Sequence, residues 1–167
     1  MKKKIFLTSI GLLIIAVFYL FIKFNGVNDV KENCLTDAFD KVFKKENSIQ
    51  LGKTYDFSEI FNCKEWDDLI VVGGQRANRT AIFLKEGIAL PSIDYFNRAQ
   101  GSLVFFFIKD KKLVSSPISF YHPDFLYFEN FNDFDYVSIK KQDAVFRCVK
   151  LDATGSDEEI LTFETVR

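Results

Sequence analysis

The chain has 167 residues, and its 22 basic and 23 acidic side chains leave a formal net charge of −1. A chain so close to neutrality lacks the basic footprint of a nucleic-acid-binding protein. Its 20 phenylalanines favour an aromatic core and exclude disorder for most of the chain.

The first predicted element is a membrane anchor at the N-terminus. Residues 5–22 are uncharged and mainly apolar, and a helix of this length would be about 27 Å long, close to the thickness of a hydrocarbon core. No small-residue cleavage site follows, which favours an uncleaved signal anchor over a cleaved signal peptide. Lys2, Lys3 and Lys4 precede the run and Lys23 alone follows it, which predicts a cytoplasmic N-terminus. We therefore expect a single pass through the inner (cytoplasmic) membrane, with the domain in the periplasm or outside; outside means the periplasm if the source is a Gram-negative bacterium.

The remaining chain, residues 27–167, is predicted to be one extracytoplasmic domain. The anchor, residues 1–26, contains four basic and no acidic residues, so the remainder has 18 basic and 23 acidic side chains and a net charge of −5. About 140 residues are enough for one domain with a sizeable core. Its charge suits a basic protein partner and offers no basic surface for nucleic acid.

The first helix of this domain is predicted over residues 30–45, where Leu35, Phe39 and Val42 belong to one apolar stripe. One helical turn is expected at residues 56–61, and a buried strand at residues 69–72. A short helix at residues 80–86 should end at Gly87. Weaker strand signals cover residues 49–54 and 93–96.

The strongest strand signal is at residues 103–108, which are apolar at every position and therefore predict a central strand. A tight turn at residues 110–112 leads into a second strand over residues 113–120, where Pro117 indicates an edge or a bulge. Closing strands are predicted at residues 137–139, 144–151 and 160–166. The predicted fold class is α+β: a single N-terminal transmembrane helix, then an antiparallel sheet of about five or six strands with one longer packed helix.

Three cysteines, Cys34, Cys63 and Cys148, are present without a C-x-x-C pair, which excludes a thioredoxin-like site and a zinc knuckle. Cys34 lies beside the apolar stripe of the predicted helix, and Cys63 just before the first strand. We favour a disulfide between these two residues, which would join the helix to the sheet and leave Cys148 as a buried thiol.

A resemblance covers about residues 57–114. Phe57-Ser58-Glu59-Ile60-Phe61, followed by Glu65-Trp66-Asp67-Asp68 and an apolar strand, resembles an uncharacterised group of small exported bacterial proteins, many of them lipoprotein-like. Members have a Phe-x-x-hydrophobic-Phe turn and then Trp-Asp before a strand, and the hairpin after residue 103 is also similar to theirs. The resemblance implies an exported location and features of the fold, and it implies no catalytic residues.

Two groups of residues could support hydrolysis, and each has a more ordinary explanation. His122 is the only histidine, so a Ser/His/Asp or Cys/His mechanism would have to use it, although its setting is that of a surface turn. Glu65, Asp67 and Asp68 could act as paired carboxylates. We expect instead that Asp67 accepts hydrogen bonds from neighbouring backbone donors and that Trp66 packs in the core.

Metal and cofactor binding are not predicted. One histidine excludes a histidine-rich zinc site. Glu129, Asp133 and Asp135 could bind calcium, but their spacing differs from that of an EF-hand loop. The sequence therefore favours a protein that is not an enzyme and has no cofactor.

The best candidate binding surface is residues 120–136, where aromatic and acidic residues interleave. The alternative is that most of these aromatic residues belong to the core. The predicted partner-binding residues are Tyr121, Phe125, Tyr127, Phe128, Glu129 and Asp133. The function we expect is that of a membrane-tethered, non-catalytic binding protein, most concretely an immunity protein that neutralises a toxin acting outside the inner membrane. The alternative is an accessory or assembly subunit of a cell-envelope complex.

Overall fold

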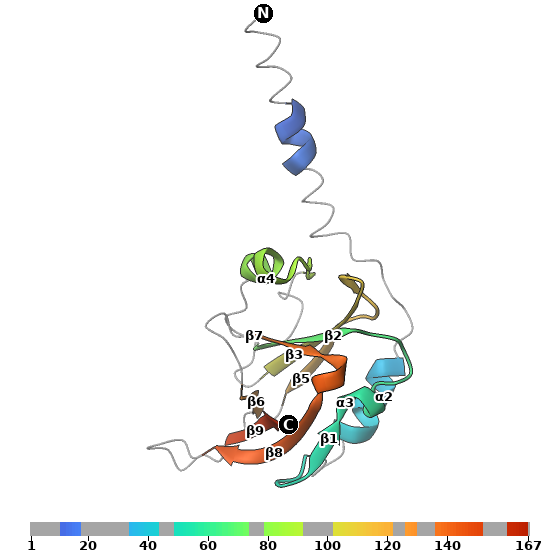
Figure 1. Cartoon of the computed structure of the whole chain (residues 1–167), viewed down its shortest axis with the longest axis vertical. Helices are drawn as coiled ribbons and strands as arrows, with labels where there is room; N and C mark the ends of the chain where they lie inside the picture. Colours follow the sequence, from blue (N-terminus) through green and yellow to red (C-terminus); the bar gives the residue numbers. More distant parts are fainter. Residues whose placement is uncertain are drawn as a thin grey trace, which may run out of the picture.

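The computed structural model describes residues 11–17, 34–43, 49–73, 79–91, 102–121, 126–129, 136–151 and 160–166. These residues form an α+β fold with two β-sheets and several short helices (Figure 1). The single sheet predicted from the sequence is therefore wrong. Two sheets form because the strands at the end of the chain pair with one another and with an early strand, rather than extending the sheet built around residues 102–109.

The larger sheet has five strands, all paired antiparallel. They are β2 (Asp68–Gly73), β3 (Ser102–Lys109), β4 (Lys112–Leu113), β5 (Ile118–Tyr121) and β7 (Tyr136–Lys140). β3 is central, with β2 on one side and both β4 and β5 along the other, and seven of its eight residues are buried. The prediction of a central strand is confirmed, since a strand that is covered on both faces needs apolar residues at successive positions.

The turn between β3 and β4 is held by a side chain from the residue just before β2, Asp67. Asp110 and Lys111 both have positive φ angles, 49° and 61°, as in the two-residue turns whose twist matches that of a hairpin. The backbone N–H of Asp110 donates to the Asp67 carboxylate at 3.1 Å. The strand predicted after this turn is interrupted, because residues 114–117 separate β4 from β5 and Pro117 has no N–H to donate.

The smaller sheet joins one early strand to three late ones. Its strands are β1 (Thr54–Asp56), β6 (Leu126–Phe128), β8 (Val145–Leu151) and β9 (Ile160–Thr165), in the order β1-β8-β9-β6. β8 pairs antiparallel with both β1 and β9, whereas β6 pairs parallel with β9. The predicted all-antiparallel arrangement is therefore wrong at β6, a strand that the sequence analysis did not predict.

The helices lie on opposite faces of the five-stranded sheet. The helical segments are α2 (Cys34–Phe43), α3 (Phe57–Ile60), α4 (Arg79–Glu86) and the 3-10 turn η2 (Lys141–Asp143). α4 covers one face, and the four-stranded sheet lies with α2 and α3 on the other face (Figure 1). Gly87 has a φ angle of +70° and ends α4, as predicted. The predicted helix at residues 30–45 is described only over α2, and the weak strand signal at residues 93–96 lies outside the described residues.

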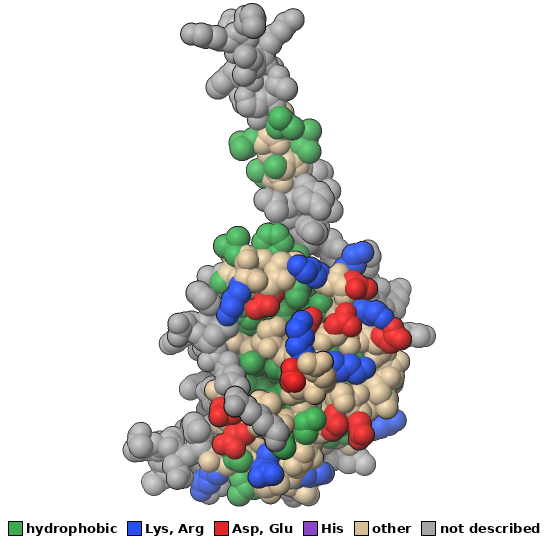
Figure 2. All heavy atoms as spheres, viewed as in Figure 1, with side chains coloured by type: hydrophobic (Ala, Val, Ile, Leu, Met, Phe, Trp, Pro, Cys, Tyr) green, Lys and Arg blue, Asp and Glu red, His purple; other side chains and the backbone are tan. Residues whose placement is uncertain are grey.

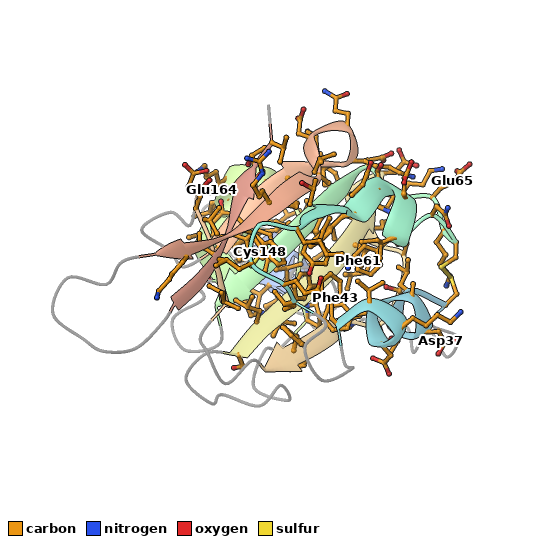
Figure 3. All side chains as sticks on the ribbon, turned by 90° about the horizontal axis from the view of Figure 1, so that it is seen from below. Asp37, Phe43, Phe61, Glu65, Cys148 and Glu164 are labelled. Carbon is orange, nitrogen blue, oxygen red and sulfur yellow. A yellow bond between two sulfur atoms is a disulfide. The ribbon has the colours of Figure 1, made fainter. Side chains whose placement is uncertain are left out.

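The space between the sheets is filled mainly by phenylalanine rings. Phe43 and Phe61 project into this core, as does Cys148, while Asp37, Glu65 and Glu164 lie at the periphery (Figure 3). A second, smaller core between the five-stranded sheet and α4 contains aliphatic side chains together with Phe106 and Tyr136. The five-stranded sheet is therefore buried on both faces.

The short helix α3 depends on its N-cap. The Asp56 carboxylate accepts from the backbone N–H groups of Ser58 at 2.9 Å and Glu59 at 3.3 Å. We expect Asp56→Ala to lower the free energy of unfolding by about 1 kcal/mol, because two N–H groups lose their acceptor. Urea unfolding would measure this change. Asp56→Asn retains an acceptor and should lose less, and equal losses in the two variants would contradict a capping role.

The prediction of a membrane anchor has to be corrected. In the part of the chain that the structure describes, no helix is long and apolar enough to cross a membrane. The described part of the predicted anchor, residues 11–17, is helical. The predictions of a single transmembrane helix and of a single-pass inner-membrane location are therefore wrong. Leu12, Leu13 and Ile15 are exposed in this helix.

Candidate binding groove

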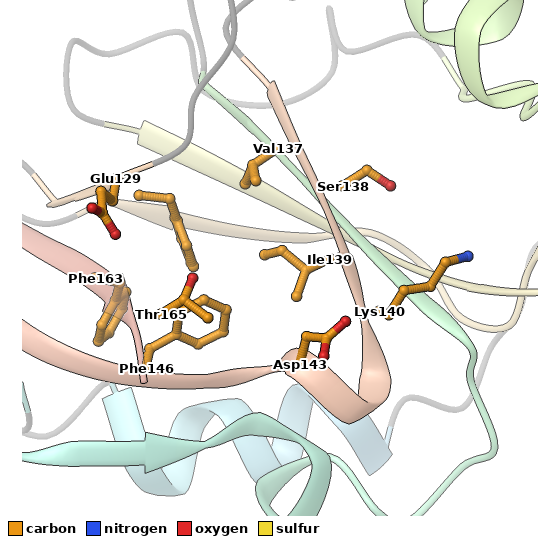
Figure 4. A pocket seen from close by; sticks show the side chains of 10 residues that line it. Glu129, Val137, Ser138, Ile139, Lys140, Asp143, Phe146, Phe163 and Thr165 are labelled. Atoms are coloured by element: carbon orange, nitrogen blue, oxygen red, sulfur yellow. The ribbon is translucent and has the colours of Figure 1, made fainter. Parts of the chain in front are cut away.

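A groove of about 190 Å³ opens between β7 and the four-stranded sheet (Figure 4). One wall is residues 137–140 of β7, and the other comes from β6, β8 and β9. Asp143 of η2 closes one end, and Glu129, which follows β6, lies at the other. The groove therefore lies where edge strands of the two sheets approach each other.

The floor of the groove is apolar because side chains alternate along β7. Val137 and Ile139 project into the groove and are 8% and 7% exposed, whereas Ser138 and Lys140 are exposed and point away from it (Figure 4). The opposite wall is formed by aromatic rings, those of Phe128, Phe146 and Phe163. The floor therefore lies directly over the phenylalanine core of the domain, whose rings at this point are 1–3% exposed.

The rim of the groove is acidic on two sides. Glu129 and Asp143 are both exposed, and Figure 4 shows their carboxylates at opposite ends of the apolar floor. The backbone fixes both positions: the N–H of Glu129 donates to the Phe163 carbonyl at 3.0 Å, and Asp143 is the last residue of η2. Among the described side chains, neither carboxylate forms an ion pair. The groove therefore presents two negative charges above an apolar surface.

β7 also presents an open edge, because among the described strands it pairs only with β2. The N–H of Lys141 donates to the Asp67 carbonyl at 2.9 Å, which sets the alternation of hydrogen bonds along the strand. In an antiparallel pair with this register, the backbone groups of Val137 and Ile139 face β2, and those of Ser138 and Lys140 face away from it. The backbone at Ser138 is therefore positioned to pair with a further strand.

The acidic cluster considered for catalysis stabilises the sheet instead. Glu65 forms an ion pair and hydrogen bond with Lys109, which lowers the pKa of the Glu65 carboxyl. Asp67 accepts from the backbone turn at Asp110, as predicted. Asp68 binds Lys140 at 2.6 Å across the β2–β7 pair, and this hydrogen bond raises the pKa of the Lys140 ammonium group.

Trp66 lies in the core, as predicted. Its side chain is 2% exposed, and its indole N–H donates to the Phe61 carbonyl at 2.9 Å. The Lys141 ammonium group lies 5.3 Å from the ring centroid, within the range of a cation–π contact. Trp66 therefore joins α3 to the end of the five-stranded sheet, which is a structural role.

Phe128, one of the predicted partner contacts, is almost completely covered. Phe128 is 3% exposed, and its ring centroid lies 5.2 Å from those of both Phe146 and Phe163. It therefore belongs to the core and only borders the groove. Glu129, the next residue, is exposed at the rim, and its role as a partner contact stays a prediction.

The structure does not describe the side chains of the other predicted residues. Tyr121 and Tyr127 belong to β5 and β6, but their side chains are outside what is described. Phe125, Asp133, Asp135 and His122 lie outside the described residues. Within the described part of the chain, no group of three His, Cys, Asp or Glu side chains could hold a metal ion.

A disulfide joins Cys34 of α2 to Cys63, the pairing that the sequence analysis favoured. Their Cα atoms are 6.2 Å apart, and the bond ties the start of α2 to the segment that follows α3. Cys148 is a buried free thiol on β8, and burial raises its pKa. Because the thiolate is the reactive form, burial and a raised pKa make Cys148 less reactive than an exposed thiol.

Comparisons of the chain with protein families, with curated proteins and with solved structures find no match. The resemblance over residues 57–114 stays a prediction. The functional argument therefore depends on the geometry of the domain itself. Figure 2 shows acidic and basic side chains interspersed over the face in view, without a broad surface of one charge there. The groove is the site for which the described residues give the most geometric support.

Proposed function

We propose that this chain is a non-catalytic protein-binding domain and that its partner docks at the groove between β7 and the four-stranded sheet. The observation that carries this proposal is the combination of an apolar floor, two opposed carboxylates and an open strand edge. An apolar centre within a polar rim is the usual anatomy of a protein–protein contact. Main-chain pairing with a sheet edge is a recurrent mode of recognising another chain.

The size of the groove favours a protein partner over a small molecule. Its volume is about 190 Å³, whereas pockets for small molecules and cofactors have volumes of about 300–1,000 Å³. A space of this size holds one or two side chains of a partner whose remaining surface rests on the surrounding strands. Because Glu65, Asp67 and Asp68 hold the turn and the sheet in place, the groove is a better candidate site than this cluster.

The most concrete form of the proposal is an immunity protein that binds and neutralises a toxin. Neutralisation by binding requires a complementary surface and no chemistry of its own. The exposed carboxylates at the groove would be complementary to a basic region of the toxin and would speed its association. The accessory-subunit alternative predicts several partners from one assembly instead of a single bound protein.

The test is affinity capture from the strain that produces the chain, with the full-length protein as bait. The double variant Glu129→Lys/Asp143→Lys should lose the protein captured by the wild type, because it reverses both charges at the rim. The matched control, Asp37→Lys/Glu59→Lys, makes the same change in charge at two exposed acids on α2 and α3 and should still capture it. Mass spectrometry of the bound fraction measures both results.

Equal capture by the two double variants would contradict docking at the groove. A single partner present in stoichiometric amount would support the toxin-binding form. A set of subunits of one assembly, captured by the wild type and the control alike, would favour the accessory-subunit alternative.

A further inference from the structure

Taking the proposed function as its basis, we infer that the groove binds a lysine or arginine side chain from an extended segment of the partner, and that this segment pairs with β7. The inference names the chemistry of the partner at the same site. It combines two independent features of the described residues, the charge and shape of the groove and the open edge of the strand beside it.

The shape of the groove matches a long basic side chain. Lysine and arginine have an apolar stem with a charged head, and they bury the stem on apolar surface while the head remains near water or a counter-charge. Val137, Ile139 and Phe146 provide the apolar surface, and Glu129 and Asp143 provide a carboxylate at each end. An acidic side chain would meet repulsion at both ends, and an apolar one would leave both carboxylates unpaired.

The one basic residue among the described residues that line the groove, Lys140, does not fill this position. Lys140 borders the groove, but its side chain points away and binds Asp68 at 2.6 Å (Figure 4). The ion pair with Asp68 holds Lys140 on the opposite face of β7. The carboxylates of Glu129 and Asp143 therefore remain available to a cation from a partner.

The strand edge indicates the conformation of the partner segment. A segment that pairs with β7 would use the outward backbone groups at Ser138 and Lys140, and its side chains would alternate between the two faces of the enlarged sheet. Every second side chain would then face the groove floor. An extended segment of about five residues with one basic residue at such a position would pair with the edge of β7 and would place a positive charge near a carboxylate of the rim.

The probes for this inference are three designed peptides, tested against the full-length chain labelled with ¹⁵N. The first is acetyl-Thr-Val-Arg-Val-Thr-amide. The second has citrulline in place of arginine, which retains the shape and removes the charge. The third is the arginine peptide with N-methyl groups on alternate backbone nitrogens, which blocks pairing with a strand edge and leaves the charge unchanged.

We expect the arginine peptide to shift the amide resonances of Ser138, Ile139 and Glu129 in two-dimensional NMR titrations. The citrulline peptide should bind about two- to fivefold more weakly, as expected for the loss of one partly exposed ion pair. The N-methyl peptide should also bind more weakly. In the variant Glu129→Gln/Asp143→Asn, the arginine and citrulline peptides should bind equally. The NMR spectrum of the variant without peptide tests directly whether the variant is folded.

Equal binding of the arginine and citrulline peptides to the wild-type chain would overturn the proposal, as would shifts confined to other regions or no shifts with any peptide. Shifts of the same resonances on dilution without peptide would identify a second copy of the chain as the occupant and would also overturn it. If capture of a partner depends on the groove but arginine and citrulline bind equally, the inference fails and the proposed function stands. If capture does not depend on the groove, the proposed function fails.

Discussion

Phe57→Ala is expected to lower the free energy of unfolding by about 3–5 kcal/mol. Phe57 is completely buried, and its ring centroid lies 5.0 Å from that of Phe146 and 5.7 Å from those of Phe43 and Phe163. The truncation removes these contacts together and leaves a cavity, because α2, α3 and the four-stranded sheet all meet at this ring. Urea unfolding followed by the fluorescence of Trp66, the single tryptophan, measures the loss.

The control for this prediction is Leu84→Ala. Leu84 is 77% exposed on α4, so its truncation should change the free energy of unfolding by no more than about 0.5 kcal/mol. Phe57→Leu keeps most of the buried volume and should cost less than Phe57→Ala, so it measures the same effect if the alanine variant fails to fold. Similar losses for Phe57→Ala and Leu84→Ala would show that Phe57 does not connect these elements.

Removal of the disulfide is the second large effect. The double variant Cys34→Ser/Cys63→Ser should lower the free energy of unfolding by about 3–4 kcal/mol, because the unfolded chain regains the entropy of an open loop. The two cysteines are 29 positions apart. Denaturant unfolding of the oxidised wild type and of the variant gives the difference.

The reduced wild type is the matched control. Under a reductant its unfolding midpoint should fall to that of the double variant, whereas the variant itself should not respond to the reductant. Cys148 is a free thiol in the wild type and is retained in the variant, so the two proteins do not differ at this position. An unchanged midpoint on reduction would contradict a stabilising role for the bond.

The sequence predicts the five-stranded sheet better than it predicts the rest of the fold. β2 and β3 are runs of successive apolar residues bounded by polar residues or glycine, and this local pattern is enough to identify strands buried on both faces. The hairpin turn after β3 and the end of α4 at Gly87 are equally local. These features follow from residues that are neighbours in the chain.

The four-stranded sheet could not be predicted in the same way. β6 is only three residues long, pairs parallel with a strand more than thirty positions later, and lies within an aromatic stretch that suits a surface as well as a core. The burial of Phe128 follows from that pairing and from no pattern in its own segment. The groove depends on the same non-local contacts, since its walls come from β7 and from the edge of the other sheet.

Part of the groove could nevertheless be predicted from the sequence. Val137 and Ile139 alternate with Ser138 and Lys140, a pattern that predicts a strand with one covered face. The sequence analysis placed a closing strand at residues 137–139 without using this alternation, and it also named Glu129 as a binding residue. What it could not supply was the distance between these segments, so Asp143 was not identified as the second carboxylate.

The topology of the four-stranded sheet has a consequence for biosynthesis. Phe57 emerges from the ribosome early, whereas its neighbour Phe163 on β9 is made about a hundred residues later, a delay of roughly 5–20 s at ordinary rates of translation. Until then the aromatic side chains of α2, β1 and α3 lack the part of their cover that Phe163 supplies. β9 lies between β8 and β6, so a nascent chain that stops before residue 160 would leave β6 unpaired and these rings exposed. Completion of the domain therefore waits until β9 has been translated.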